Sequence, residues 1–173
     1  MKLKNIKSII PVAVITIAAF GLGSCTGDLN VENINPQQVS TFDQDAIFNK
    51  IYANMVLTGQ TGPDGNKDIE GIDEGTSNFI RQVWNANELT TDEAHCLWGD
   101  AGIPEFNHNA WSDAHPMMQA LYYRLYFGIT VSNFFLQQTS NSDQKTNTQR
   151  AEARLMRALF YYYLMDFYGN VPM

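Results

Sequence analysis

The sequence TQRAEARLMRALFYYYLMDFYGNVP, residues 148–172, decides the fold of this chain. It contains neither glycine nor proline before Gly169 and Pro172, which together form a typical helix stop. Apolar side chains recur at helical spacing and predict an amphipathic helix over residues 148–168. The predicted apolar face consists of Leu155, Ala158, Leu159, Tyr162 and Met165, and a second stripe holds Arg150, Arg154 and Arg157.

A second long helix is predicted immediately upstream, over residues 116–137. Its apolar side chains surround most of the helix, so we expect it to be buried on more than one side. The polar connector of residues 139–147 would join the two helices into an antiparallel hairpin. Hairpins of this kind stack into tetratricopeptide-like units. One hairpin cannot cover its own apolar faces, so we expect further helices after Met173 and interpret the chain as part of a longer protein.

The upstream half predicts two shorter helices separated by irregular loops. Thr41 and Gln44 have capping-box spacing, and apolar residues follow at helical spacing as far as Val56. Residues 79–89 form the second predicted helix. Residues 58–77 are rich in glycine and aspartate and predict a long loop, and residues 92–111 predict another irregular stretch. Since no strand alternation is evident, the predicted fold is all-α, with tetratricopeptide-like helical hairpins and long irregular loops.

The amino terminus has the layout of a secretory signal. Lys2, Lys4 and Lys7 precede an apolar run over residues 9–23, which is shorter than the roughly 20 residues of a membrane-spanning helix. The run ends in Leu-Gly-Ser before Cys25 and resembles the lipobox of bacterial lipoproteins. We therefore predict a lipoprotein signal peptide over residues 1–24, acylation of Cys25 (for example by palmitate) and a polar tether over residues 25–39. The alternative is an ordinary signal peptide followed by a chance cysteine.

The charge balance argues against nucleic acid as a partner. Removal of the signal peptide leaves eight basic and eighteen acidic residues, a net charge of −10. Nucleic-acid affinity depends on clustered Lys and Arg, and so does attraction to an anionic membrane surface. Cys96 is the other cysteine of the sequence. We expect it to be a small buried hydrophobe, and a reactive thiol is the alternative.

Motifs for catalysis or metal binding are incomplete. Residues 92–95 read Asp-Glu-Ala-His, as in a helicase, but the sequence has no GxxxxGK[ST] phosphate-binding loop. Asp64, Asn66 and Asp68 resemble the start of an EF-hand loop, but Ile69 stands where glycine is required. The three histidines lack the spacing of a helical metal site. The sequence therefore predicts no enzyme activity, no metal and no cofactor.

The tryptophans are the stronger indication of a binding site, because aromatic faces stack on flat ligands such as sugars. Trp98 and Trp111 lie in the irregular stretch, and Trp98 is followed by Gly99 and Asp100, whose carboxylate can accept hydrogen bonds from hydroxyl groups. We predict Trp98, Asp100 and Trp111 as candidate ligand-binding residues, with Trp98 as the main contact. The alternative is that both tryptophans pack between helices, and Trp111 is expected to fold back onto the start of the 116–137 helix. Trp84, inside a predicted helix, is expected in the core.

In their order, these features resemble the SusD/RagB family of outer-membrane lipoproteins from glycan-foraging Gram-negative bacteria. The similarity starts after the lipobox with DLNVENINP (residues 28–36) and continues with NELTTDEA (87–94), WGD (98–100) and Trp111. It ends with AEARLMRA (151–158) and YGNVP (168–172).

This resemblance implies a SusD-like, tetratricopeptide-like fold without enzyme activity. It also implies a cell-surface protein, lipid-anchored in the outer membrane, that captures a glycan for a SusC-like TonB-dependent transporter and acts as a hinged lid. The same lid role for peptides or another nutrient is the alternative. Family members are about three times longer, so residues 40–173 would be the amino-terminal part of the domain, and we expect this part alone to bind ligand weakly and to aggregate.

Overall fold

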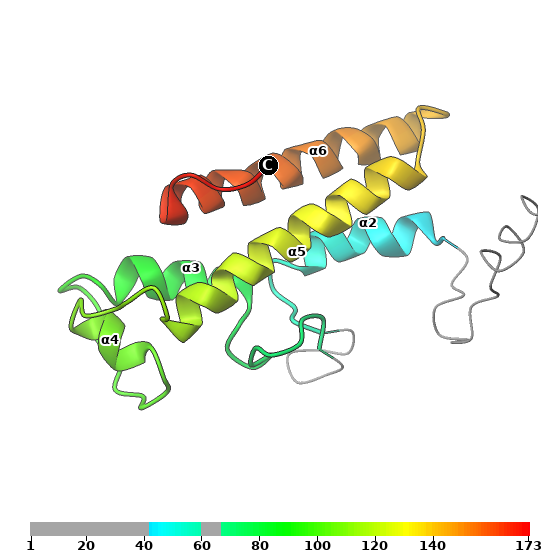
Figure 1. The fold of residues 1–173 in the computed structure, drawn as a ribbon. Helices are drawn as coiled ribbons and strands as arrows, with labels where there is room; N and C mark the ends of the chain where they lie inside the picture. Colours follow the sequence, from blue (N-terminus) through cyan, green and yellow to red (C-terminus); the bar gives the residue numbers. More distant parts are fainter. Residues whose placement is uncertain (1–41, 60–66) are drawn as a thin grey trace, which may run out of the picture. The chain divides into compact units, whose positions relative to one another are not determined.

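The computed structural model describes residues 42–59 and 67–173, and these ranges contain five helices in the order α2, α3, α4, α5, α6 (Figure 1). Within the described residues, β-structure is limited to one isolated antiparallel bridge between Gly59 and Lys67. The all-α prediction is therefore confirmed. The predicted signal peptide, the acylation site Cys25 and the tether lie outside the described residues.

Helices α5 (Pro116–Gln138) and α6 (Gln144–Tyr168) form the predicted antiparallel hairpin (Figure 1). The hydroxyl of Tyr168, at the end of α6, donates a hydrogen bond to the carbonyl of Met118 at the start of α5. Helix α6 begins four residues earlier than predicted. The reason is Asp143, whose carboxylate accepts the Thr146 N–H at 2.9 Å and caps the helix amid the polar connector.

Two of the three predicted arginines hold the hairpin together. Arg150 Nη1 donates to the carbonyl oxygens of Leu136, at 2.8 Å, and Thr139. These are carbonyls at the end of α5, which have no partner within their own helix. Arg157 Nη1 donates to Asn133 Oδ1 at 2.7 Å, also on α5.

The predicted apolar face of α6 was wrong in its orientation. The buried hydrophobic residues of α6 are Ala153, Met156, Phe160 and Leu164, whereas Leu155, Ala158, Tyr162 and Met165 are exposed, Leu155 to 67%. Of the predicted face, Leu159 packs partly against the core. The cause is the opposing helix: Gly128 of α5 offers no side chain, and a Cβ there would lie 2.6 Å from the Phe160 ring. Phe160 therefore fits on this side of α6 and orients the helix.

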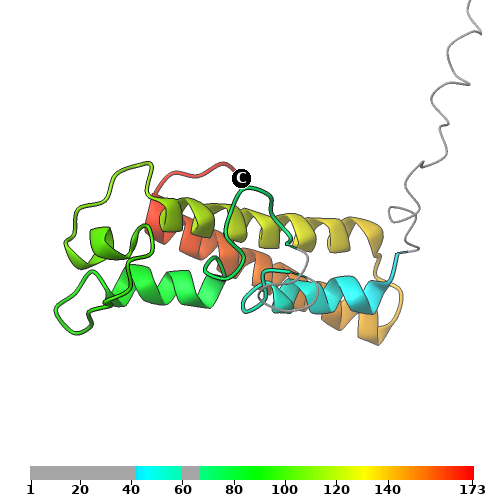
Figure 2. The ribbon, with the colours of Figure 1, turned by 90° about the horizontal axis from the view of Figure 1, so that it is seen from below.

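Helix α5 lies at the centre of the fold and packs against α6, α2 and α3, so its predicted burial on more than one side is confirmed. Helix α2 lies beside its carboxyl-terminal half and α3 beside its amino-terminal half (Figures 1 and 2). The buried core around it comprises Ile51, Phe79, Leu121, Leu125, Ile129, Phe135, Ala153, Met156, Phe160 and Leu164. None of the helices within residues 42–59 and 67–173 is long and apolar enough to cross a membrane.

Helix α2 (Gln44–Ala53) starts and ends differently from the prediction. Its cap is Asp43, which accepts the Ala46 N–H at 3.0 Å, and the predicted cap Thr41 lies outside the described residues. The helix stops before Met55 and Val56. Asn54 ends it with a fully buried side chain, whose amide donates to the Arg124 carbonyl of α5 at 3.3 Å.

Helix α3 (Phe79–Glu88) matches its predicted range to within one residue. Helix α4 (Ile103–Asn107) was not predicted, because that stretch was expected to be irregular. Its N-cap is Gly102, whose φ of 101° favours glycine and whose N–H donates to Glu105 at 3.0 Å. Such a short helix gives too little periodicity to be found in the sequence.

Candidate functional site

Trp98 and Asp100, two of the predicted ligand-binding residues, lie in one cleft of about 520 Å³. We call it the Trp98 cleft. It opens between α3 and the segment that leads to α4, and its lining is mainly apolar. The lining residues are Thr76, Arg81, Trp84, Asn85, Leu89, His95, Cys96, Leu97, Trp98, Asp100, Ile103 and Met117.

Trp98 is 59% exposed, and a cation packs against its ring. The guanidinium carbon of Arg81 lies 5.3 Å from the ring centroid, within the range of a cation–π contact. Arg81 is itself fixed, because its Nη1 donates to the Gly75 carbonyl at 2.7 Å. One face of the indole is thus supported by Arg81, and the exposed part of the ring remains available to a ligand.

Trp84 belongs to the same cleft and is about half exposed, so its expected place in the core was wrong. The buried residues of α3 are Phe79, Gln82 and Asn85, and Trp84 falls on the other side of the helix. The sequence placed Trp84 in a helix but did not show whether its ring lies on the buried or on the exposed side of that helix. The cleft therefore contains two exposed indoles instead of the one that was predicted.

The segment before Trp98 is held against α4 by two hydrogen bonds between the Asn107 side chain and the Cys96 backbone. Asn107 Nδ2 donates to the Cys96 carbonyl at 2.7 Å, and the Cys96 N–H donates to Asn107 Oδ1 at 3.3 Å. Cys96 is half-buried and packs against the small cluster of Leu89, Ile103, Phe106 and Met117. It is a cleft-lining residue and not the fully buried hydrophobe that was expected. Because Trp98 lies two residues on, this anchor also limits where its ring can go.

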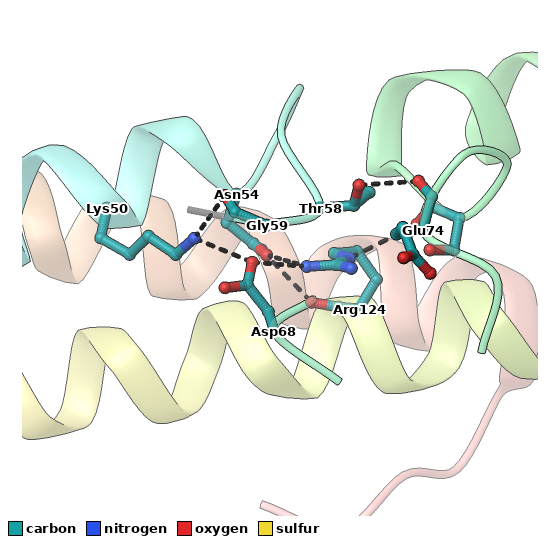
Figure 3. A network of polar contacts seen from close by, with 8 residues as sticks. Lys50, Asn54, Thr58, Gly59, Asp68, Glu74 and Arg124 are labelled. Atoms are coloured by element: carbon teal, nitrogen blue, oxygen red, sulfur yellow. Dashed lines mark hydrogen bonds and ion pairs between the residues drawn. The ribbon is translucent and has the colours of Figure 1, made fainter. Parts of the chain in front are cut away.

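The buried side chain of Arg124 on α5 holds the loop of residues 68–77 (Figure 3). Thr76 of this loop lines the Trp98 cleft. Arg124 is 1% exposed, and its Nη1 lies 3.3 Å from Asp68 Oδ2 and 3.2 Å from Asn54 Oδ1. Its Nε donates to the Ser77 carbonyl at 3.4 Å. Burial lowers the pKa of the Arg124 guanidinium, and the nearby Asp68 carboxylate opposes that change. The pair thus fastens both ends of residues 68–77 to the helical core.

Further contacts extend this network to α2 and to the cleft. Lys50 Nζ of α2 lies 2.8 Å from the same Asp68 oxygen, and the Thr58 hydroxyl donates to the Glu74 carbonyl at 2.7 Å (Figure 3). The loop is then joined to α3, where Gln82 donates to the carbonyl of Thr76, a cleft-lining residue. Sequence reasoning missed Arg124 and Asp68 as organisers of the site. The available signal was a lone arginine within a helix predicted to be buried.

Trp111, the third predicted residue, lies in a different cleft of about 620 Å³. Its ring contacts Phe106 of α4 edge-on, with 6.3 Å between centroids, and the cleft is completed by residues from the first turns of α5. Trp111 thus faces the first turns of α5 across this cleft, and its packing onto the start of that helix stays a prediction. The ring nevertheless remains 49% exposed. The structure thus separates Trp111 from Trp98 and Asp100.

The three histidines have different surroundings and do not form one site. His115 is buried and caps α5: its Nδ1 accepts the Met118 N–H, so Nε2 is protonated and donates to the Gly102 carbonyl at 3.0 Å. His95 and His108 are exposed. In the part of the chain that the structure describes, no three His, Cys, Asp or Glu side chains come together in a way that could hold a metal ion.

Comparison with known proteins identifies the family to which the chain belongs. Residues 29–173 match the SusD-like family described as "Starch-binding associating with outer membrane". Together with the all-α fold, this match shows that the chain belongs to the SusD/RagB family, as the sequence motifs indicated. Members of this family are binding proteins.

Among curated proteins, the chain is similar to "Starch-binding protein SusD" of Bacteroides thetaiotaomicron. The two are 43% identical over 176 aligned residues, which cover 99% of this chain and 32% of that protein. The chain therefore spans about a third of the length of the curated relative it matches.

Proposed function

We propose that this chain is the amino-terminal, ligand-capturing part of a glycan-binding outer-membrane lipoprotein and that it binds sugar rings in the Trp98 cleft. The observation that supports this most directly is the exposed Trp98 ring, supported on one face by Arg81 and placed in the same cleft as Asp100. A rigid aromatic face stacks on the apolar face of a sugar, and a carboxylate accepts hydrogen bonds from sugar hydroxyls.

The composition of the cleft supports binding rather than hydrolysis. A glycosidase places two carboxyl groups on either side of the scissile bond. Among the described residues that line the Trp98 cleft, Asp100 is the one carboxylate. The family description as starch-binding agrees with a capture role and suggests an α-linked glucan as the first ligand to test.

We also propose a location and a transport partner for the protein. Acylation of Cys25 would anchor the protein in the outer membrane at the cell surface, and the tether of residues 25–39 would give it reach. A SusC-like TonB-dependent transporter would receive the glycan, with this protein as its lid. The support for these steps is the lipobox-like sequence before Cys25 and membership of a family associated with the outer membrane.

The test is titration of the full-length protein that contains these residues with maltoheptaose, an α-linked glucose oligomer, followed by calorimetry, because this part alone is expected to bind weakly. Trp98→Ala should weaken binding by several-fold, since a stacked ring contributes about 0.5–1.5 kcal/mol beyond its buried area. Tyr162→Ala is the matched control, because Tyr162 is equally exposed but lies on α6 outside the cleft. Equal affinity of the Trp98→Ala variant and the wild type would overturn the placement of the ligand, and binding of peptides but not of any glycan would favour the alternative nutrient.

A further inference from the structure

The cleft that contains Trp111 is a second aromatic surface, and the Trp98 cleft shares none of its lining residues. We call it the Trp111 cleft. Three separate elements form it: the segment before α5, the first turns of α5, and the end of α6. Its lining residues are Trp111, Ser112, Asp113, Met118, Gln119, Tyr122, Tyr123, Phe167 and Tyr168.

Two of these rings form a fixed wall. The Tyr168 hydroxyl donates to the Met118 carbonyl, and burial raises the pKa of Tyr168 well above its usual value. The Tyr122 ring packs against Tyr168 edge-on, at 5.2 Å between centroids, and against Tyr126 at 4.8 Å. These rings connect α5 to α6 and so have a structural role of their own.

Trp111 and Tyr123 differ from this wall because they are open to solvent. Trp111 is 49% exposed and Tyr123 is 44% exposed. The Phe106 and Trp111 rings meet edge to face with their centroids 6.3 Å apart, and the Tyr122 and Tyr123 rings do so at 6.0 Å. Each ring is thus oriented by a neighbour through an edge contact. An edge-to-face contact covers at most one face of a ring, so Trp111 and Tyr123 each keep a face that can stack on a ligand.

The polar groups of the cleft define the class of ligand. Asp113, Gln119 and Ser112 line it together with the rings, and no basic side chain is among its described lining residues. A carboxylate disfavours an anionic ligand, whereas carboxylate, amide and hydroxyl groups all hydrogen-bond to sugar hydroxyls. Aromatic faces beside neutral or acidic hydrogen-bonding groups fit an uncharged carbohydrate. We infer that the Trp111 cleft is a second carbohydrate-binding site, with Trp111 and Tyr123 as its stacking rings; the ligand class rests on the proposed function.

The experiment uses the fact that the chain has three tryptophans, one in the Trp111 cleft and two in the Trp98 cleft. The variant Trp84→Phe/Trp98→Ala retains Trp111 as the sole indole and removes the main stacking ring of the other cleft. The variant Trp84→Phe/Trp111→Phe retains Trp98 alone. Because this part alone is expected to bind weakly, both are titrated with maltoheptaose up to high millimolar concentration while tryptophan emission is recorded, and circular dichroism checks that both remain helical.

We expect a saturable change in tryptophan emission in both variants. Addition of Tyr123→Ala to the first variant should weaken its binding by about three- to tenfold, the value of one stacked ring. Addition of Tyr162→Ala, which lies outside both clefts, should leave it unchanged.

The outcomes separate this inference from the proposed function. A response from Trp98 without one from Trp111 overturns the second site and leaves the proposed function standing. A response from Trp111 alone supports the second site and overturns the assignment of the ligand to the Trp98 cleft. Silence of both indoles overturns both, and a Trp111 response that is insensitive to Tyr123→Ala overturns the role of Tyr123 and with it the site as described.

Discussion

Asp68 and Arg124 are 56 residues apart in the sequence, yet the carboxylate Oδ2 of the first lies 3.3 Å from Nη1 of the second in the interior of the protein. Their side chains are 5% and 1% exposed. The ion pair joins a glycine-rich loop to α5, and the same loop borders the Trp98 cleft through Thr76. The stability of the core and the shape of the cleft are therefore linked through these two residues.

Asp68→Asn should destabilise the protein strongly. Removal of one member of a buried ion pair leaves the other charge uncompensated and typically costs about 3–5 kcal/mol. Urea unfolding followed by circular dichroism measures the loss. The matched control is Glu70→Gln in the same loop, because Glu70 is exposed and its ion pair with Lys67 lies at the surface. Similar unfolding midpoints for Asp68→Asn and Glu70→Gln would show that the Arg124–Asp68 pair does not stabilise the fold.

Gly128→Ala should destabilise the contact between α5 and α6. A Cβ at this position would lie 2.6 Å from the Phe160 ring and 2.7 Å from Asn54 Nδ2, so the core has to shift. Overpacking of this kind costs about 1–3 kcal/mol, visible as a lower melting temperature. Gly99→Ala is the control, since no described atom lies within 4 Å of a Cβ there. If Gly128→Ala melts like the wild type, the proposed reason for the orientation of α6 is wrong.

The Asp143 cap should give the protein an acid-dependent loss of stability. The hydrogen bonds from the Thr146 backbone and hydroxyl hold the pKa of Asp143 below 3.8, its ordinary value. A pKa that is lower in the folded state contributes stability that is fully present above about 3.8 and is lost as the pH falls through the lower folded value. The melting temperatures of the wild type and Asp143→Asn should therefore differ at neutral pH and converge in strong acid. A difference that grows on acidification would refute this assignment.

The exposed apolar residues of α6 should cause self-association. Leu155, Tyr162 and Met165 of α6 are each more than half exposed, and exposed apolar surface promotes association. We expect concentration-dependent oligomers in sedimentation experiments, which the double variant Leu155→Glu/Met165→Glu should reduce. Val56→Glu, an exposed apolar position in the turn after α2, serves as the control. A monodisperse wild-type monomer at high concentration would rule the expectation out.

Cys25→Ala should release the protein from the membrane. The prediction rests on the lipobox-like sequence and on an apolar run too short to span a bilayer. Labelling of cells with a fatty acid analogue should mark the wild type and not the variant, and fractionation should show the variant outside the membrane pellet. Incorporation of label into Cys25→Ala would exclude this cysteine as the acylation site.

The sequence by itself determined the existence and type of the four longer helices and the family, but not the short helix α4. Helical periodicity and stop residues are local properties, so α3 and α5 were placed to within one residue, and the end of α6 at Tyr168 was found from Gly169 and Pro172. The motifs around residues 87–100 and 151–172 were sufficient for the family, because they are read in order along the chain. The indication that Trp98 and Asp100 belong to one site likewise came from their closeness in the sequence.

Only the tertiary structure decided which side of each helix is buried. Helix α6 is rich in apolar residues on several sides, and the choice among them depended on Gly128 of another helix, which accommodates Phe160. The exposure of Trp84, the separation of Trp111 from Trp98, and the pairing of Asp68 with Arg124 also depend on contacts between distant segments. Periodicity repeats within one helix and contains no information about the partner, so the burial of a face is settled only when the partner's small and large side chains are in place.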